Sequence, residues 1–244
     1  MGSIHGEISD EFATPYAPRH EAAPVPRLVT EVTARQYVKD LDALPKPVGM
    51  GKIFALAKAH MDMPLAEIRA LLASTDHLAR VGAVSIMDFQ ARSRSTSDDD
   101  RRALFELYID QHEQIDTWDL VDRSAIWVVG DYLRDKPRDV LYELARSDRP
   151  MERRTAILST FAFIRHGDLE DAYRIAELLI DDDQDLVHKA VGWMLREAGK
   201  RDEARLRAFL DQHAATMPRV MLRYSIEKLD AQVRASYLAR KSTG

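Results

Sequence analysis

The sequence predicts an all-α protein built from repeated pairs of helices. From about Val29 onward, apolar residues recur at spacings of three and four, the pattern of one face of a helix. No stretch alternates apolar and polar residues as a half-buried strand would, and a short motif returns at intervals of 31, 34 and 35 positions. Together these observations favour a helical-repeat architecture without strands.

The first segment, residues 1–27, is expected to be a disordered or loosely packed arm. It holds four prolines among small and polar neighbours and shows no sustained periodicity. The remaining residues, 28–244, are predicted to form a single domain.

Roughly a dozen short helices in antiparallel pairs are expected within this domain. Their apolar faces lie at residues 53–57, 65–72, 104–108 and 175–179. First-turn prolines, capping residues and terminal glycines separate them. These markers are Pro64, Ser97 or Asp98, Pro137, Pro150, Gly167–Asp168, Gly199 and Pro218.

A four-residue motif of the form basic, any, small, branched marks the repeat. Its copies are Arg123–Ile126, Arg154–Ile157, His188–Val191 and Arg223–Ile226, and a weaker copy, Val81–Val84, lies 42 residues upstream. Each copy is expected to open the second helix of a pair, where a small residue lets the neighbouring helix approach closely. This period is typical of a HEAT-like solenoid, a curved slab with a concave face. A compact irregular helical bundle is the alternative.

Composition excludes several classes of function. The chain has no cysteine, which excludes a disulfide framework, a thiolate metal site and a thiol nucleophile. It has no apolar run of about 18 residues and no signal-peptide pattern at its start, so no membrane partner is expected. A cytoplasmic protein is therefore expected.

The charge is unevenly distributed. The net charge of −5 argues against a wholly basic nucleic-acid binder. From Asp185 onward, however, 12 Lys and Arg stand against 7 Asp and Glu, whereas the first 184 residues carry 23 against 33. A basic face is therefore expected in the C-terminal part.

Neither a metal nor a cofactor is expected. No two of the eight histidines share a helix face with a carboxylate at a metal-binding spacing. The aspartate triplets Asp98–Asp100 and Asp181–Asp183 each precede a helix, so capping explains them better than a cation does. The turn at Gly49–Lys52 is too short for a phosphate-binding loop.

Four residues are candidates for a chemical site. Trp118 and Asp122 are four residues apart, so they share one face of a helix. Arg154 and Trp193 lie in later repeats, and equivalent helices line up along the concave surface, where the four side chains could converge. Taken alone, the spacing favours a plainer interpretation: packing tryptophans, a solvated or arginine-paired carboxylate, and a surface arginine.

The sequence resembles the AlkD-type DNA alkylation repair proteins, which are HEAT-like solenoids. The resemblance runs from about Lys52 to Leu229 and is densest in four stretches. They are TWDLVDRSA (117–125), ERRTAILST (152–160), LVHKAVGWMLREAGK (186–200) and MPRVMLRYSIEKL (217–229). The third and fourth are the most specific, because helix composition alone does not produce runs of that length.

The resemblance implies a monofunctional DNA glycosylase that releases cationic alkylated purines, mainly N7-alkylguanine and N3-alkyladenine, from duplex DNA. The family's catalytic aspartate matches Asp122, and its two aromatic residues match Trp118 and Trp193. Its active-site arginine matches Arg154. The chain departs from the family at Met151, where tryptophan is usual, and between Val48 and Lys52, where a proline is missing.

These residue types suit the implied reaction. An N3- or N7-alkylated purine is positively charged, so it leaves without being protonated and needs no general acid. The barrier lies in the oxocarbenium-like sugar and the addition of water, both of which a carboxylate such as Asp122 assists. Trp118 and Trp193 are expected to present indole faces to the cation, at about 0.5–2 kcal/mol each. Arg154 is expected to hold a flanking phosphate.

Six further basic residues are candidate phosphate contacts, with a solvated helix face as the alternative for each. They are Lys189, Arg196, Lys200, Arg219, Arg223 and Lys228. The expected partner is double-stranded DNA containing alkylated bases, bound by a monomer associated with the nucleoid. A non-catalytic solenoid that binds DNA structure and a protein-interaction scaffold are the alternative functions.

Overall fold

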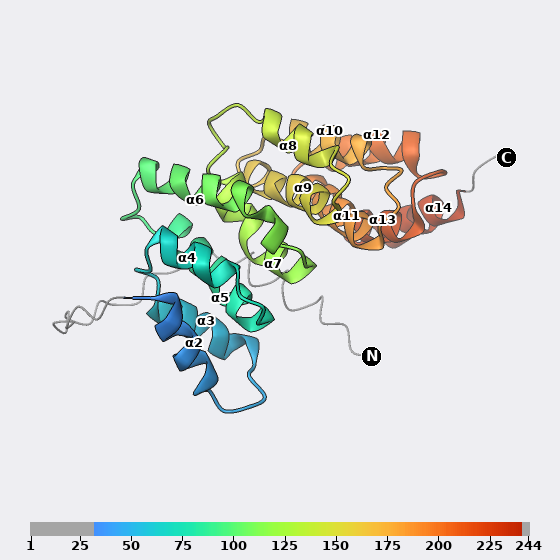
Figure 1. Ribbon diagram of the computed structural model, residues 1–244. Coiled ribbons are helices and arrows are strands. Elements are labelled where there is room, and N and C mark those ends of the chain that lie inside the picture. Colours follow the sequence, from blue (N-terminus) through green and yellow to red (C-terminus); the bar gives the residue numbers. More distant parts are fainter. Residues whose placement is uncertain (1–31, 241–244) are drawn as a thin grey trace, which may run out of the picture. The chain divides into compact units, whose positions relative to one another are not determined.

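The structure is a computed structural model that describes residues 32–240 (Figure 1). Within these residues, thirteen α-helices and two short helices of other types follow one another without a strand. The all-α prediction is confirmed. The arm predicted for residues 1–27 lies outside the described residues, so it stays a prediction, as does the domain boundary at residue 28.

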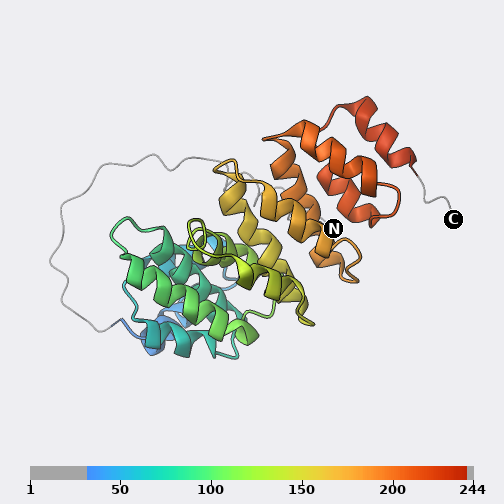
Figure 2. The same cartoon turned by 90° about the horizontal axis from the view of Figure 1, so that it is seen from above.

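The helices of the repeats fall into two rows (Figures 1 and 2). The first row consists of α4 (Leu65–Leu72), α6 (Asp98–Asp110), α8 (Asp139–Ala145), α10 (Glu170–Leu178) and α12 (Glu203–His213). The second row consists of α5 (His77–Arg92), α7 (Trp118–Ser124) with η2 (Ala125–Gly130), α9 (Pro150–Ile164), α11 (Asp185–Gly199) and α13 (Arg219–Ser225). The remaining helices are α2 (Ala34–Asp42), α3 (Met50–Ala59), the 3₁₀ turn η1 (His112–Gln114) and α14 (Ala231–Ala239).

Contacts between the rows repeat along the chain. Helices α4, α6, α8 and α10 each pack on the second-row element that follows them, and successive second-row helices pack on one another from α5 to α13. Helix α3 extends the second row by packing on α5. This order of contacts is that of a helical repeat.

The small residues of the repeat motif are buried between these helices. They are Ala83, Ala125, Ala156, Ala190 and Ser225. Each lies in a second-row element, the weaker copy included, so the motif belongs to the second helix of a pair. It does not open that helix as predicted, because every copy starts three to five residues after the helix begins. In α7 and α13, which are 7 residues long, the motif lies at the end of the helix.

Two glycines permit the closest approaches within the second row. A Cβ atom at Gly130 would lie 2.2 Å from the Ser159 carbonyl oxygen, and one at Gly192 would lie 2.6 Å from the Met221 carbonyl oxygen. Neither distance is compatible with a side chain. The backbones of η2 and α9, and of α11 and α13, therefore pack directly against each other.

Helix α7 continues into a π-helix, η2. There the Asp131 amide donates to the carbonyl of Ile126 at 2.9 Å, five residues back. The wider turn changes the direction of the side chains that follow Asp122, and such bulges are frequent at functional sites. None of the helices between residues 32 and 240 is both long and apolar enough to cross a membrane.

Candidate functional site

Asp122 and Arg154 form a buried ion pair. Arg154 donates from Nε to Oδ1 of Asp122 at 2.7 Å and from Nη2 to Oδ2 at 2.8 Å. Their side chains are 8% and 5% exposed, respectively. A bidentate pair fixes the orientation of the carboxylate, so Asp122 has one defined geometry.

The repeat brings these two residues together. Asp122 and Arg154 are 32 positions apart, and Leu186, whose carbonyl accepts a hydrogen bond from Arg154 Nη1, lies 32 positions further on. Pro150 starts α9 and sets Arg154 in the second turn. The guanidinium of Arg154 thus joins three successive second-row helices, α7, α9 and α11.

A buried polar network lies directly beside Arg154. The Thr155 hydroxyl is hydrogen-bonded to His112 Nε2 at 2.8 Å and to the Tyr108 hydroxyl at 3.1 Å. Burial raises the pKa of Tyr108, its hydrogen bonds to Thr155 and Ser124 oppose the rise, and the negative charge of Asp122 adds to it. Tyr108 therefore remains a neutral phenol next to the ion pair.

His112 in this network makes stability depend on pH. Burial lowers the pKa of His112 from its ordinary value of 6.5, and Glu152 partly opposes the shift. The unfolded chain therefore takes up a proton on His112 before the folded protein does. The contribution of His112 to stability is complete above about pH 6.5 and is lost as pH falls through its folded pKa, by up to about 1.4 kcal/mol per pH unit.

Urea unfolding at pH 7.5 and 5.5 tests this prediction. The wild type is expected to lose more free energy of unfolding between the two pH values than His112→Gln does, because glutamine keeps a side-chain N–H but does not titrate. Equal losses in the two proteins would contradict the assignment.

Trp118 begins α7, one helical turn before Asp122, and is half-buried. The residues beside it anchor this end of the helix. The Thr117 hydroxyl donates to Asp119 Oδ1 at 2.7 Å, and Asp119 Oδ2 pairs with His77 Nε2 of α5, also at 2.7 Å. Contacts to the preceding repeat therefore hold Trp118 in position.

Trp193 lies on α11, seven residues after Leu186, and is also half-buried. Its ring centroid is 6.4 Å from that of Phe161, which lies seven residues after Arg154 on α9. Seven residues correspond to two helical turns, or roughly 10 Å. Asp122 and Arg154 are thus in direct contact. Trp118 lies one turn before Asp122 on α7, and Trp193 lies two turns after Leu186, the backbone partner of Arg154, on α11.

Three of the six candidate phosphate contacts already have acidic partners. Arg196 pairs with Glu197 and Glu227, Lys200 with Glu197, and Lys228 with Glu227. All three basic residues line a pocket of about 320 Å³ at the ends of α11 and α13. Contact with DNA phosphates would have to compete with these ion pairs.

The other three candidates have no carboxylate partner among residues 32–240. Lys189 is half-buried on α11, one turn after Leu186 and one turn before Trp193. Arg223 is exposed on α13, and Arg219 donates to the carbonyls of Leu238 and Arg240. Of these three, Lys189 is therefore the closest along the chain to the four-residue site.

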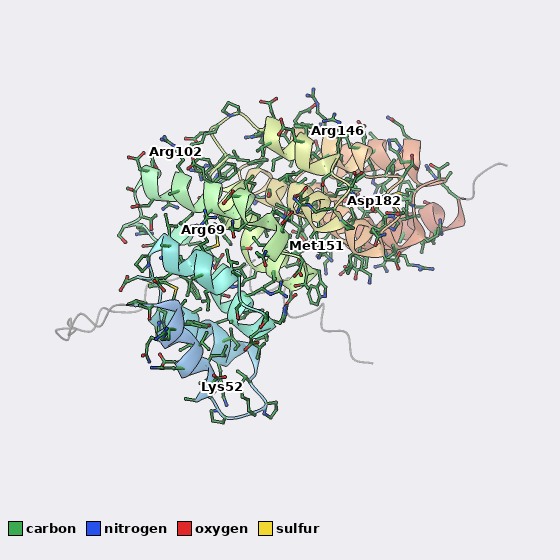
Figure 3. The ribbon with its side chains drawn as sticks, in the orientation of Figure 1. Lys52, Arg69, Arg102, Arg146, Met151 and Asp182 are labelled. Atoms are coloured by element: carbon green, nitrogen blue, oxygen red, sulfur yellow. The ribbon has the colours of Figure 1, made fainter. Side chains whose placement is uncertain are left out.

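Met151 occupies the first turn of α9, where the resemblance leads us to expect tryptophan, and it is half-buried (Figure 3). Two residues on, Arg153 pairs with Asp182 in the loop before α11, with Nε 2.5 Å from Oδ2. Asp182 also accepts from the Gln184 amide at 2.8 Å, so it supports the turn into α11.

No group of three or more His, Cys, Asp or Glu side chains in the described part of the chain is arranged to hold a metal ion.

Several residues around the Asp122–Arg154 pair are not evident from the sequence. Leu186 contributes only a backbone carbonyl, which leaves no trace in residue type. Thr155 and His112 are joined across two helices that the repeat motif does not pair. Of these residues, Phe161 is the easiest to predict from the sequence, because it follows Arg154 by the same seven residues that separate Trp193 from Leu186.

Comparisons with known proteins place these observations in a family context. The family described as DNA alkylation repair enzyme matches residues 47–229. A solved structure, described as a predicted DNA alkylation repair enzyme from Enterococcus faecalis, is similar with a TM-score of 0.60 and 15% sequence identity, over 83% of this chain and 97% of that chain. At this identity the similarity shows a shared fold. No curated protein matches the chain.

Proposed function

Because this chain belongs to the family of DNA alkylation repair enzymes, we propose that it is a monofunctional DNA glycosylase. The substrates are cationic alkylated purines in duplex DNA, of the N7-alkylguanine and N3-alkyladenine types. The proposal rests above all on the Asp122–Arg154 pair, which presents a buried carboxylate in a fixed orientation one turn from Trp118. The cytoplasmic, nucleoid-associated location and the monomeric state stay predictions.

In the proposed reaction the bond between C1′ and the purine nitrogen breaks, and its electron pair leaves with the base. The base departs neutral, because its positive charge is cancelled by those electrons. The sugar becomes oxocarbenium-like and water adds at C1′. The proton of that water passes to a general base, for which Asp122 is the candidate. The products are a free alkylated purine and an abasic site.

Asp122 has the capacity to serve this reaction. A carboxylate offers about four acceptor positions, and Arg154 occupies one on each oxygen. In the proposed reaction the carboxylate also accepts a hydrogen bond from the attacking water. In a largely buried setting the carboxylate charge stabilises the sugar cation more strongly than it would in bulk water.

Arg154 is assigned here as a positioning residue. Three of its N–H groups already have acceptors, namely the two Asp122 oxygens and the Leu186 carbonyl. The phosphate contact expected from the resemblance would require this buried group to exchange partners. Holding Asp122 is therefore the role that its geometry supports best.

A base-release assay tests the proposal. A duplex with a single N7-methylguanine is incubated with the protein, and the free base is quantified by chromatography. Release above the spontaneous rate is expected, and the strand should break only after alkali or heat treatment. A matched duplex with O6-methylguanine, which carries no formal charge, should release nothing. The absence of release from the N7-methylguanine duplex would overturn the proposal.

One observation favours a second candidate function. Arg154 engages both oxygens of Asp122, as it would in a pair that serves only the fold. A non-catalytic protein that binds DNA structure would then bind duplex DNA in a salt-dependent manner without releasing the base. The same assay, run alongside a binding measurement, separates the two functions.

A further inference from the structure

The third tryptophan of the chain, Trp127, contacts two arginines. The guanidinium carbon of Arg92 lies 4.8 Å from its ring centroid, and that of Arg165 lies 4.6 Å from it. Trp127 belongs to η2, Arg92 is the last residue of α5, and Arg165 follows α9. The Trp127 indole of η2 thus contacts arginines at the C-terminal ends of the preceding and following second-row helices, α5 and α9.

A third arginine joins this group from the next repeat. Arg201 follows α11, and its Nη2 donates to the carbonyl of Arg165 at 3.2 Å. Arg92, Arg165 and Arg201 are all exposed. We call these three residues the arginine cluster.

The arginine cluster is short of negative charge. Arg165 and Arg201 form no ion pair with any carboxylate in residues 32–240. Arg92 must share Asp88 with Arg123, at 3.4 and 3.1 Å respectively. Positive charge therefore exceeds negative charge around Trp127.

The electrostatics of Arg165 show that the three guanidinium groups influence one another. Although Arg165 is exposed, partial burial of its guanidinium lowers its pKa, the Asp131 carboxylate opposes the shift, and the charges of Arg92 and Arg201 lower the pKa further. Asp131 itself pairs with Arg134 at 3.4 Å, so its charge is shared. Mutual repulsion within the cluster is thus only partly compensated by the protein.

Helix dipoles explain part of this arrangement. A cation at a helix C-terminus is favourable by about 0.3–1 kcal/mol, which accounts for one arginine at the end of each helix. It does not account for two of them contacting one indole while the third is hydrogen-bonded to the Arg165 carbonyl, because each helix end would be equally satisfied by an arginine kept apart from the others. An anion bound between them would remove the repulsion.

We propose that the arginine cluster binds phosphates of a DNA duplex beside the lesion; the choice of DNA rests on the function proposed above. Guanidinium groups bind phosphate with two parallel hydrogen bonds, and Trp127 holds two of them ready at little entropic cost. Trp127 follows Asp122 by five residues of continuous helix, which rise roughly 7 Å. Phosphates along one strand advance about 3.4 Å each. Along the helix axis, Trp127 is therefore roughly two phosphate spacings from Asp122.

The test measures binding of an undamaged duplex by fluorescence anisotropy at several salt concentrations. Each phosphate contact adds about 0.9 to the slope of log affinity against log salt. Arg165→Gln/Arg201→Gln is expected to lower that slope by about 1–2 and to raise the dissociation constant. Both side chains are exposed, so the variant is expected to fold, which circular dichroism verifies.

Arg146→Gln is the matched control. Arg146 is exposed at the end of the first-row helix α8 (Figure 3) and, like Arg165, has no carboxylate partner in residues 32–240. Its replacement should leave the slope unchanged. Trp127→Leu should weaken binding more than Trp127→Phe, which keeps an aromatic face for the two arginines.

An unchanged slope in the double variant would overturn this inference, as would equal losses in the double variant and in Arg146→Gln. Tighter binding of polyglutamate than of duplex DNA, lost in the double variant, would overturn it in favour of an acidic protein partner. Because the duplex is undamaged, the result does not depend on base release. A reduced slope in the double variant, together with no release of N7-methylguanine by the wild type, would support phosphate binding by the arginine cluster and contradict the glycosylase proposal.

Discussion

Replacing Asp122 with Asn is expected to slow release of N7-methylguanine at least about tenfold, which corresponds to about 1.4 kcal/mol in the activation barrier. Asparagine has the same size as aspartate and still offers one oxygen to Arg154. It has no negative charge to stabilise the sugar cation and does not accept a proton from water. The loss should therefore fall on the chemical step, with little change in binding of undamaged duplex.

Single-turnover rates with the protein in excess over the duplex isolate that step. The matched control is Asp116→Asn, which changes an exposed carboxylate paired with Arg80, two residues before Trp118. This control should release the base at the wild-type rate. A wild-type rate in Asp122→Asn would remove Asp122 from the mechanism, and an equal slowing in both variants would indicate a non-specific effect of charge.

The repeat architecture can be predicted from the sequence because it requires small residues at regular positions between packed helices. Helices approach closely only where the side chains between them are small, so Ala125, Ala156 and Ala190 recur at intervals of 31 and 34 residues and are buried. The π-helix at η2 was not predictable, because the sequence AIWVVG suits an α-helix equally well. Its hydrogen bonds shift through packing against α9, where Gly130 meets the backbone at Ser159.

Candidate residues for the site could be proposed from the sequence, but their contacts could not. The spacing of Trp118 and Asp122 predicts that they share one helix face. Arg154 follows Asp122 by about one repeat length, so it is expected at the equivalent place in the next repeat. The direction of the Arg154 side chain was undetermined, since an arginine at that position suits a phosphate as well as a carboxylate. The rotation of α9 relative to α7 decides between them, and it turns the guanidinium inward, onto Asp122.

Replacing Arg154 with Leu is expected to destabilise the protein by about 3–5 kcal/mol, because the variant removes the guanidinium that contacts both oxygens of the buried Asp122 carboxylate. The side chains of the pair are 5% and 8% exposed, so water screens it little. Urea unfolding followed by circular dichroism measures the loss. A loss below about 1 kcal/mol, the usual contribution of an exposed pair, would contradict the assignment of Arg154 as a buried partner.

The double variant Asp122→Leu/Arg154→Leu separates the cost of an orphaned charge from the cost of lost packing. Removing both charges also removes the buried carboxylate, so the double variant should be more stable than Arg154→Leu alone. A phosphate-contacting Arg154 predicts the opposite pattern: stability unchanged by Arg154→Leu, and a salt slope of DNA binding lowered by about 0.9. Unfolding and binding measured on the same variants therefore decide whether Arg154 acts on the DNA directly or through Asp122.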